Sequence, residues 1–344
     1  MKRLFMAAVS FVVTGFVLLG AGRADACAGL IGSNGAVNLG RTTTLAAYHD
    51  GVEHYVTAFQ FLGGGGQFGT LIPLPGVPSD VERGGAWTLQ RLVRETEPRP
   101  VGLARQDAVA GAFAPEAEVL IQKRIDALDI TVLRGGATSV AEWASQHGFR
   151  LSPDAPEVLD FYAKRSPIFL AAIFDGQAAI ERGQRVGDGT PVHLTIPTSN
   201  PWVPLRILGL GKQTADRIQA DVFLLTDAKP ALLPGPQPGM ALAWDQSATR
   251  SLLDDLRSDD GMSWVPRAAW LTKLRIDAKA GDLSYDLAVD ASGEGKPSPV
   301  AAGLQAPPEL ESSMFGLDFF LATGGLFAIV IVTLRLRAKE AARS

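Results

Sequence analysis

The stretch TTTLAAYHDGVEHYVTAFQF, residues 42–61, decides how we expect this chain to fold. Apolar and polar side chains alternate with a period of two on both sides of Asp50 and Gly51. An Asp-Gly pair between two such runs is the strongest short-range signal for a β-hairpin. The sequence therefore predicts two antiparallel strands joined by a two-residue turn.

Runs of this kind recur between turn residues further along the chain. They are LDITVL at 128–133, ADVFLLTD at 220–227, WLTKLRIDA at 270–278 and LSYDLAVDA at 283–291. We expect the last two to pair as a second hairpin. The chain is therefore predicted to be rich in strands.

Helices are predicted at two places. Ser139 followed by Glu142 has the spacing of a capping box, and it opens a segment that ends at Gly148. Residues 156–165 start with proline and end with Lys-Arg, as helix termini prefer. Strands combined with a few helices predict the α+β fold class.

A weak internal similarity points to a duplication. LAAYHDG at 45–51 and LAAIFDG at 170–176 share Leu-Ala-Ala and Asp-Gly at the same spacing. One interpretation is that the chain holds two related α+β units. The alternative is coincidence in a chain rich in alanine and glycine.

The first 26 residues have the three parts of a secretory signal peptide. Lys2 and Arg3 are basic, an apolar run follows, and the small-x-small sequence ADA ends at Ala26. We therefore expect cleavage between Ala26 and Cys27. Two alternatives are an uncleaved membrane anchor and a lipid attached to Cys27.

The other end of the chain has the features of a membrane-spanning helix. Residues 315–334, from Phe315 to Leu334, are almost uninterrupted in apolar character, and roughly 20 residues of helix cross a hydrocarbon core. A basic tail follows at 335–344, and basic flanks stay on the cytoplasmic side. The sequence predicts a single-pass protein of the bacterial cell membrane, with its N-terminal domain extracytoplasmic.

Between these ends we expect one folded region and one linker. Residues 27–290 form the predicted extracytoplasmic α+β region, and residues 291–313, rich in Pro, Gly, Ser and Ala, form a flexible tether. The whole chain has 32 basic and 36 acidic residues, of which 25 and 33 lie within 27–314, a net charge of −8. An acidic region argues against nucleic acid as a partner.

Histidines are the first candidates for chemistry. In the predicted hairpin His49 and His54 fall on one face as a diagonal pair, about 7–8 Å apart, and they can share a metal only with a third ligand from elsewhere. No cysteine or HxxE spacing supplies that ligand, so no metal site is predicted. We place His147 at a helix end, and His193 in a strand with a structural role.

No catalytic residue and no cofactor are predicted. The chain lacks GxSxG, HExxH and SxxK motifs, and the glycine run at 63–66 lacks the Lys-Ser/Thr of a phosphate-binding loop. Asp254, Asp255, Asp259 and Asp260 are clustered, but not at the spacing of a calcium loop. We interpret them as a solvated helix end.

The sequence favours a binding or scaffold module of the cell envelope, with an envelope protein or polymer as its partner. The tether lets such a domain search near the membrane, and the proline-marked strips at 73–78 and 202–204 are candidate contact surfaces. The alternative is a hydrolase of envelope polymers that uses paired carboxylates, because its two acids need no fixed spacing in the sequence.

Five segments resemble a known bacterial family. They are CAG at 27–29, TLIPLPGVP at 70–78, LDITVLRGGATSVAEWASQHGF at 128–149, PIFLAAIF at 167–174 and VPLRILGLG at 203–211. On these the chain resembles DUF2330, a domain of unknown function. The resemblance implies an exported or membrane-tethered envelope protein, and it implies no particular activity, cofactor or substrate.

Overall fold

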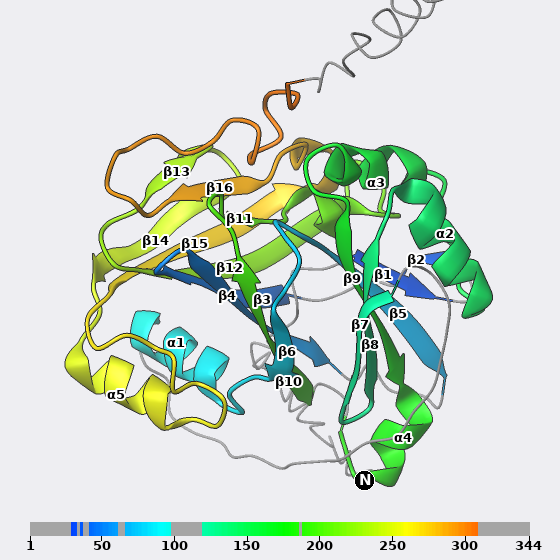
Figure 1. The fold of residues 1–344 in the computed structure, drawn as a ribbon, viewed down its shortest axis with the longest axis horizontal. Coiled ribbons are helices and arrows are strands. Elements are labelled where there is room, and N and C mark those ends of the chain that lie inside the picture. Colours follow the sequence, from blue (N-terminus) through cyan, green and yellow to red (C-terminus); the bar gives the residue numbers. More distant parts are fainter. Residues whose placement is uncertain are drawn as a thin grey trace, which may run out of the picture. The chain divides into compact units, whose positions relative to one another are not determined.

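The computed structural model describes residues 29–32, 35–36, 41–60, 66–97, 119–185 and 188–308. The chain divides into two compact units, residues 1–306 and 307–344. Nearly all described residues belong to the first unit, and the fold below is the fold of that unit (Figure 1).

The strands of the described part form three sheets. In chain order the strands are β1 (Gly29–Gly32), β2 (Gly35–Ala36), β3 (Arg41–His49), β4 (Val52–Gln60), β5 (Gln67–Leu74), β6 (Asp80–Arg83), β7 (Val119–Ile125), β8 (Leu128–Arg134), β9 (Ile168–Asp175), β10 (Gly189–Pro197), β11 (Trp202–Val203), β12 (Arg217–Thr226), β13 (Ala231–Leu233), β14 (Met240–Ser247), β15 (Trp270–Lys279) and β16 (Leu287–Asp290). Sheet A has the order β14-β15-β12-β3-β4-β10-β6, sheet B the order β2-β1-β5-β9-β8-β7, and sheet C the order β11-β16-β13. Strands β3 and β12 pair in parallel, and the other described pairs are antiparallel.

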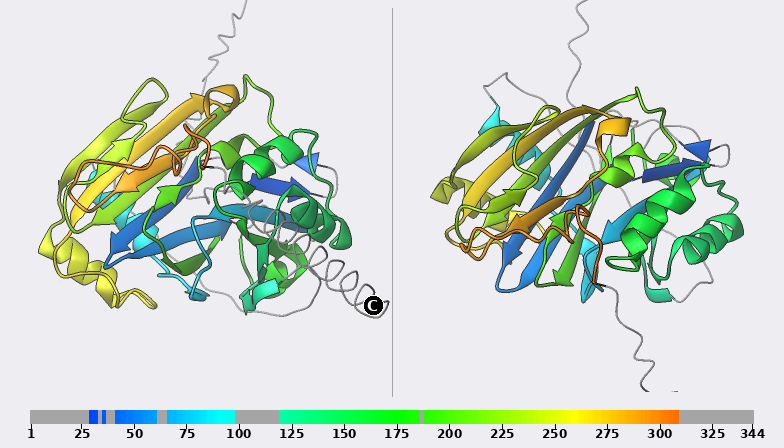
Figure 2. Two further views of the ribbon diagram at one scale, coloured as in Figure 1. Left: turned by 45° about the horizontal axis from the view of Figure 1, so that its top comes forward. Right: turned by 90° about the horizontal axis from the view of Figure 1, so that it is seen from above.

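Sheets A and B pack against each other around the main hydrophobic core (Figure 2). Because side chains alternate between the two faces of a strand, each sheet contributes every second residue to this core. Tyr55 and Leu224 of sheet A belong to the same buried cluster as Ile130 and Phe174 of sheet B. The centre of the unit is therefore a β-sandwich.

Helices cover the outer faces of both sheets (Figure 1). The α-helices are α1 (Thr88–Thr96), α2 (Ala137–Gln146), α3 (Ala155–Ala163), α4 (Gly176–Glu181) and α5 (Arg250–Ser258), and the 3-10 helices are η1 (Arg206–Gly209) and η2 (Ala280–Asp282). Leu92 of α1 and Leu253 of α5 pack on Phe223 of sheet A. Trp143 of α2 and Leu159 of α3 share a second cluster with the outer face of sheet B.

The first predicted hairpin is confirmed. Strands β3 and β4 pair in antiparallel register, and Asp50 and Gly51 form the turn between them with φ angles of 49° and 80°. Positive φ at both central residues is the signature of a type I′ turn, which matches the twist of the flanking strands. The alternating pattern around Asp-Gly was therefore sufficient to predict this element.

Both predicted helices are present, although one of them begins earlier than expected. Helix α2 starts at Ala137 without a side-chain cap, so Ser139 lies inside the helix and is not its cap. Gly148, with φ 73°, ends the helix as predicted, because the amides of Gly148 and Phe149 bond back to the last turn. Helix α3 carries its proline in the first turn, as expected.

The predicted α+β class is wrong, because the described fold is largely β. The five α-helices of the described residues have only six to ten residues each, and four of them, α1, α2, α3 and α5, act as covers on the sheets. Sequence patterns undercounted the strands because interior strands such as β9 and β12 are buried along most of their length and read as continuous apolar runs.

The second predicted hairpin is also wrong. Strand β15 pairs with β12 and β14 in sheet A, whereas β16 lies between β11 and β13 in sheet C. The 3-10 helix η2 follows β15 directly and separates the two strands. Turn residues between two strands therefore did not determine which strands pair.

The internal similarity does not mark a repeated unit. LAAYHDG lies on β3 of sheet A, where Asp50 begins a hairpin turn. LAAIFDG lies on β9 of sheet B, where the Asp175 carboxylate accepts a hydrogen bond from the amide of Ala178 and caps α4. The two segments therefore have different neighbours and different continuations.

The first part of the predicted tether packs on the folded unit. Ala301 and Ala302 are buried in the cluster under α2 and α3. The carbonyl of Ala302 accepts a hydrogen bond from the amide of Asp286, and the carbonyl of Ala301 accepts one from Arg165. In the structure the folded unit therefore extends beyond residue 290, the boundary predicted from composition.

Candidate functional site

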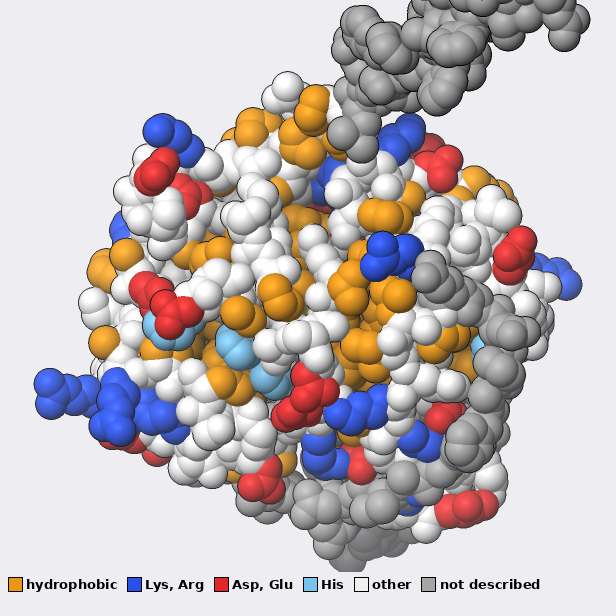
Figure 3. Space-filling view, viewed as in Figure 1, with side chains coloured by type: hydrophobic (Ala, Val, Ile, Leu, Met, Phe, Trp, Pro, Cys, Tyr) orange, Lys and Arg blue, Asp and Glu red, His pale blue; other side chains and the backbone are white. Residues whose placement is uncertain are grey.

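Three histidines meet on the outer face of sheet A. Alternation places His49, His54 and His193 on the same face of the adjacent strands β3, β4 and β10, where Ala47 is opposite His54 and Val56 is opposite His193. Figure 3 shows histidine side chains in a row on this face, with acidic side chains at both ends of the row.

We call this region the histidine face. It is defined by Asp50, Asp227, His49, His54, His193, Trp264, Asp80 and Glu82. Its members come from β3, β4, β6 and β10, from the turn after β3, from the residue after β12 and from the loop after α5. The fold thus assembles residues from both halves of the chain on one surface.

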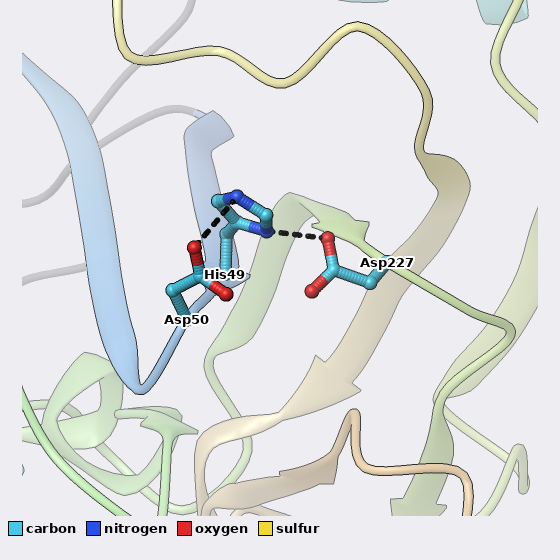
Figure 4. A group of neighbouring side chains, drawn as sticks. All are labelled: His49, Asp50 and Asp227. Carbon is cyan, nitrogen blue, oxygen red and sulfur yellow. Dashed lines mark hydrogen bonds and ion pairs between the residues drawn. The ribbon is translucent and has the colours of Figure 1, made fainter.

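His49 lies between two carboxylates (Figure 4). Its Nδ1 is 2.6 Å from Asp227 Oδ1, and its Nε2 is 3.3 Å from Asp50 Oδ2. Asp50 belongs to the β3–β4 turn, and Asp227 follows β12, the parallel neighbour of β3. Sequence analysis found the histidine and missed Asp227, because only the pairing of β3 with β12 brings these residues together.

His54 and His193 form a hydrogen-bonded pair covered by Trp264. His54 Nδ1 is 2.9 Å from His193 Nε2, and the Trp264 ring stacks on the His54 ring at 4.0 Å between centroids. Burial, with a smaller contribution from a neighbouring imidazole, lowers the pKa of each histidine to about 4. Both rings are therefore neutral near pH 7, and His193 is buried as expected for a structural histidine.

Two acids complete the face on the edge strand β6. Glu82 lies opposite His193 in the β6–β10 register, and Asp80 lies opposite Thr195. A hydrogen bond between the two carboxyls raises the pKa of Glu82 and lowers the pKa of Asp80. Asp80 also accepts a hydrogen bond from Lys123 Nζ at 3.2 Å.

The opposite face of the same hairpin holds a buried acid, Glu53. Both carboxyl oxygens are buried and have no hydrogen bond of normal geometry, although the main chain of Trp202 acts to lower the pKa of the group. Burial raises the pKa of Glu53 to about 8. Its cross-strand neighbour Tyr48 donates a hydrogen bond to the carbonyl of Thr198 at 2.9 Å.

A small polar pocket lies beside Tyr48. It has a volume of about 80 Å³, and its walls include Asn200, Asp290, Ser292 and Lys296. The Asp290 carboxylate already accepts hydrogen bonds from Ser292 and from the amide of Lys296. The pocket is therefore closed on one side by a loop that Asp290 itself orders.

Three of the four clustered aspartates considered for calcium have protein partners, and the fourth, Asp260, is exposed. Asp254 pairs with Arg257, and Asp255 pairs with Arg91. The Asp259 carboxylate accepts hydrogen bonds from the main-chain amides of Ala86 at 3.1 Å and Trp87 at 2.9 Å, and from the Thr88 hydroxyl at 2.9 Å. These acids serve helix capping and ion pairing, and they do not converge on one point.

The two strips expected to contact partners are largely inside the fold. Residues 202–204 are buried, with Trp202 3% exposed in the cluster under α3. In the strip at 73–78, Pro73 lies within β5 and pairs with Phe169 of β9, and Val77 is exposed. The strip at 202–204 is therefore buried, whereas the strip at 73–78 runs from the buried end of β5 into a partly exposed turn.

Several predicted positions lie outside the described residues. These are the cleavage site at Ala26 and Cys27, the glycines at 63–65, and the predicted membrane helix from Phe315 to Leu334. Among the residues that the structure does describe, no helix has the length and apolar character needed to cross a bilayer. His147, which is described, follows α2 and contacts the carbonyl of Trp143 at 2.8 Å.

Comparison with solved structures finds distant similarity to baculovirus P35. A mutated P35 after caspase cleavage shares 7% identity and a TM-score of 0.36, with 73% of this chain and 100% of that chain covered. P35 in complex with caspase-8 has 6% identity and a TM-score of 0.38, with 74% of this chain and 96% of that chain covered. Baculovirus P35 has 9% identity and a TM-score of 0.36, with 72% of this chain and 96% of that chain covered. TM-scores this low support no inference about fold or function.

Sequence comparison identifies the family. No curated protein sequence matches the chain. The model of a family described as an uncharacterized protein conserved in bacteria, DUF2330, matches residues 22–279, which is most of the chain. The resemblance stated from the five sequence segments is thereby confirmed, and the chain belongs to the DUF2330 family.

Proposed function

We propose that this chain is a binding module of the bacterial cell envelope and that the histidine face is its binding surface. The observation that carries the proposal is the row of carboxylates and imidazoles beside α1 and α5. Asp227 and Asp80 are 49% and 48% exposed and His49 is 39% exposed, so this part of sheet A is open to a ligand. Polar groups gathered on a rigid sheet suit recognition better than groups on loops.

The chemistry of the face favours a neutral, hydroxyl-rich polymer. Carboxylates accept hydrogen bonds from hydroxyls, and imidazoles can both donate and accept. The net charge of −8 over residues 27–314 opposes anionic polymers. Of the envelope polymers, an uncharged glycan strand therefore fits this surface best.

The proposed location rests on the two ends of the sequence. A signal peptide at 1–26 and an apolar segment at 315–334 followed by basic residues support export with retention in the cell membrane. In that arrangement the folded unit is extracytoplasmic and the membrane is its permanent partner. Protease added to protoplasts should then remove the folded unit and leave a small membrane-bound fragment.

Calorimetric titration of the full chain in detergent micelles with soluble envelope glycan oligosaccharides tests the binding surface. Glu82→Ala or Asp227→Ala should weaken binding about tenfold or more, because a hydrogen bond to a charged group contributes about 1.5–3 kcal/mol. Asp282→Ala and Glu142→Ala remove exposed acids elsewhere and serve as controls. Equal binding by all four variants, or none by the unaltered chain, would contradict the proposal.

The second candidate is a hydrolase that uses Asp80 and Glu82 as its paired carboxylates. One specific observation favours it, namely that one hydrogen bond moves the pKa values of the two acids in opposite directions. Two acids in contact can share a proton, as in the carboxyl pair of aspartic proteases. This differs from the arrangement in glycosidases, whose carboxyls are about 5 Å or more apart. Turnover of envelope polymer that is abolished by Asp80→Asn, with binding retained, would favour the hydrolase.

A further inference from the structure

We propose that His49, Asp50 and Asp227 form a binding site for a divalent transition-metal ion of the zinc type. The sequence offered a histidine without enough partners, and the fold supplies the missing donor from the end of β12. The site lies at one end of the histidine face, where the type I′ turn meets the parallel pair β3–β12. It does not depend on the proposed glycan binding.

The distances among the three side chains fit a common ion. One ligand atom from each of them lies within 4.8 Å of the other two. Two atoms bound to one tetrahedral zinc ion at about 2.1 Å are about 3.4 Å apart, and His49 Nε2 and Asp50 Oδ2 are separated by 3.3 Å. Asp227 lies at the other ring nitrogen, with 2.6 Å between its Oδ1 and His49 Nδ1, so its exposed side chain has to rotate toward Nε2 before the three donors surround one ion (Figure 4).

The charge and the donor atoms select the class of ion. Two carboxylates with a neutral imidazole carry a charge of −2, which a divalent cation balances. One nitrogen and two carboxylate oxygens are donors that zinc accepts, whereas calcium and magnesium prefer oxygen ligands alone. The site therefore favours zinc over both of these ions.

The backbone holds the donors in place while leaving water access. The carbonyl of Gly51 accepts a hydrogen bond from the amide of Thr198 at 3.1 Å, which fixes the turn that carries Asp50. The side chains of His49, Asp50 and Asp227 are 39%, 86% and 49% exposed, so water can complete the coordination. An exposed site with three protein ligands should bind zinc with micromolar affinity.

A different arrangement accounts for the same contacts without an ion. A protonated His49 ring donates through both nitrogens, and the two carboxylates then simply stabilise the imidazolium. In that case removing Asp50 or Asp227 changes no metal affinity. The two explanations therefore differ in a measurable quantity.

The experiment is a titration of the full chain in detergent micelles with metal ions. Zinc binding is measured by calorimetry, and cobalt(II) binding is measured by the visible absorption of the bound ion. Cys27→Ser is the background, because it removes the one thiol that could bind zinc. We expect one ion per chain. Asp50→Asn and Asp227→Asn should each weaken binding on the order of tenfold or more, and Asn tolerates the positive φ at position 50.

Matched controls keep the result interpretable. His147→Ala removes a histidine from the other side of the sandwich and should leave zinc affinity unchanged, and thermal unfolding of each variant verifies that it folds. The proposal is overturned if zinc fails to saturate at about 1 mM, if both Asp→Asn variants bind like the background, or if calcium displaces zinc at equal concentration.

Discussion

Asp286 and Arg165 form a buried ion pair, with 2.5 Å between an oxygen of the Asp286 carboxylate and Arg165 Nη2. Their side chains are 0% and 4% exposed. Asp286 also accepts hydrogen bonds from the Tyr162 hydroxyl and the main-chain amide of Leu205. A single carboxylate therefore joins the end of α3 to the segment before η1 and to the approach to β16.

Replacing Asp286 by Ala should lower the free energy of unfolding by about 3–5 kcal/mol, because it leaves the Arg165 guanidinium buried without its partner. Denaturant unfolding followed by tryptophan fluorescence measures the change. Asp282→Ala, an exposed aspartate nearby, should stay within about 0.5 kcal/mol of the unaltered chain. Equal effects of the two substitutions would mean that the pair does not fix the fold.

A chain that ends at Ala306 should unfold cooperatively at nearly the temperature of the full folded unit, whereas one that ends at Asp290 should unfold several degrees lower. The shorter chain lacks Ala301 and Ala302, so Arg165 and the amide of Asp286 lose the carbonyls that they donate to. Circular dichroism during heating compares the two. Identical transitions would show that residues after 290 contribute nothing to stability.

Glu53→Gln should stabilise the protein at about pH 8 by a few kcal/mol and should have little effect at about pH 4.5. The folded-state pKa of about 8 lies above the ordinary value of 4.5, so the unfolded chain releases this proton at lower pH than the folded chain does. Stability from this group is therefore lost as pH rises from about 4.5 to about 8.

Urea unfolding at both pH values measures the Glu53 effect. Glu142→Gln, an exposed site on α2, is the matched control and should give the same small difference at each pH. If Glu53→Gln proves destabilising at about pH 8, the carboxylate has a partner that stabilises its charged form.

The histidine pair should make the protein sensitive to acid. The pKa values of His54 and His193 are lowered to about 4 from 6.5, so the unfolded chain binds protons first and stability falls as pH decreases from about 6.5 to about 4. The Asp80 carboxylate acts to raise the pKa of His193, whereas the charge of His49 lowers the pKa of His54 further. His193→Gln should flatten the pH dependence of unfolding over this range, while His147→Gln should leave it unchanged.

Asp259→Ala should destabilise the protein by about 1–3 kcal/mol, since it removes the acceptor that caps α1 from another part of the chain. Asp260→Ala, one residue further and exposed, is the control. Gly85→Ala should mimic Asp259→Ala, because a Cβ at Gly85 would come within 2.5 Å of the Asp259 carboxylate. Unfolding midpoints of the three variants provide the comparison.

Local features of this fold were predictable from sequence, and long-range pairings were not. The turn at Asp50 and Gly51 and the helix end at Gly148 depend on backbone conformations that a few neighbouring residues determine. The separation of β15 from β16 depends on sheet C, which forms only when β11 and β13 come together around β16. No pattern within one segment contains that information.

In the candidate site, too, neighbours within one hairpin were predictable from sequence and partners from distant strands were not. His49 and His54 were found because one hairpin carries both of them. Asp227 lies 178 residues from His49 along the chain, and its role depends on the parallel pairing of β3 with β12. Trp202 was misjudged because an aromatic residue between prolines gives no sign of burial until the cluster under α3 is known.

The position of β3 between β4 and β12 also sets an order of events during folding. One edge of β3 can pair as soon as the hairpin has emerged, because β4 follows after two residues. The other edge has no partner until residues 217–226 have been made and delivered. Throughout that interval an apolar strand keeps an open edge, which is a template for mispairing, so a nascent chain needs protection for as long as its second half is missing.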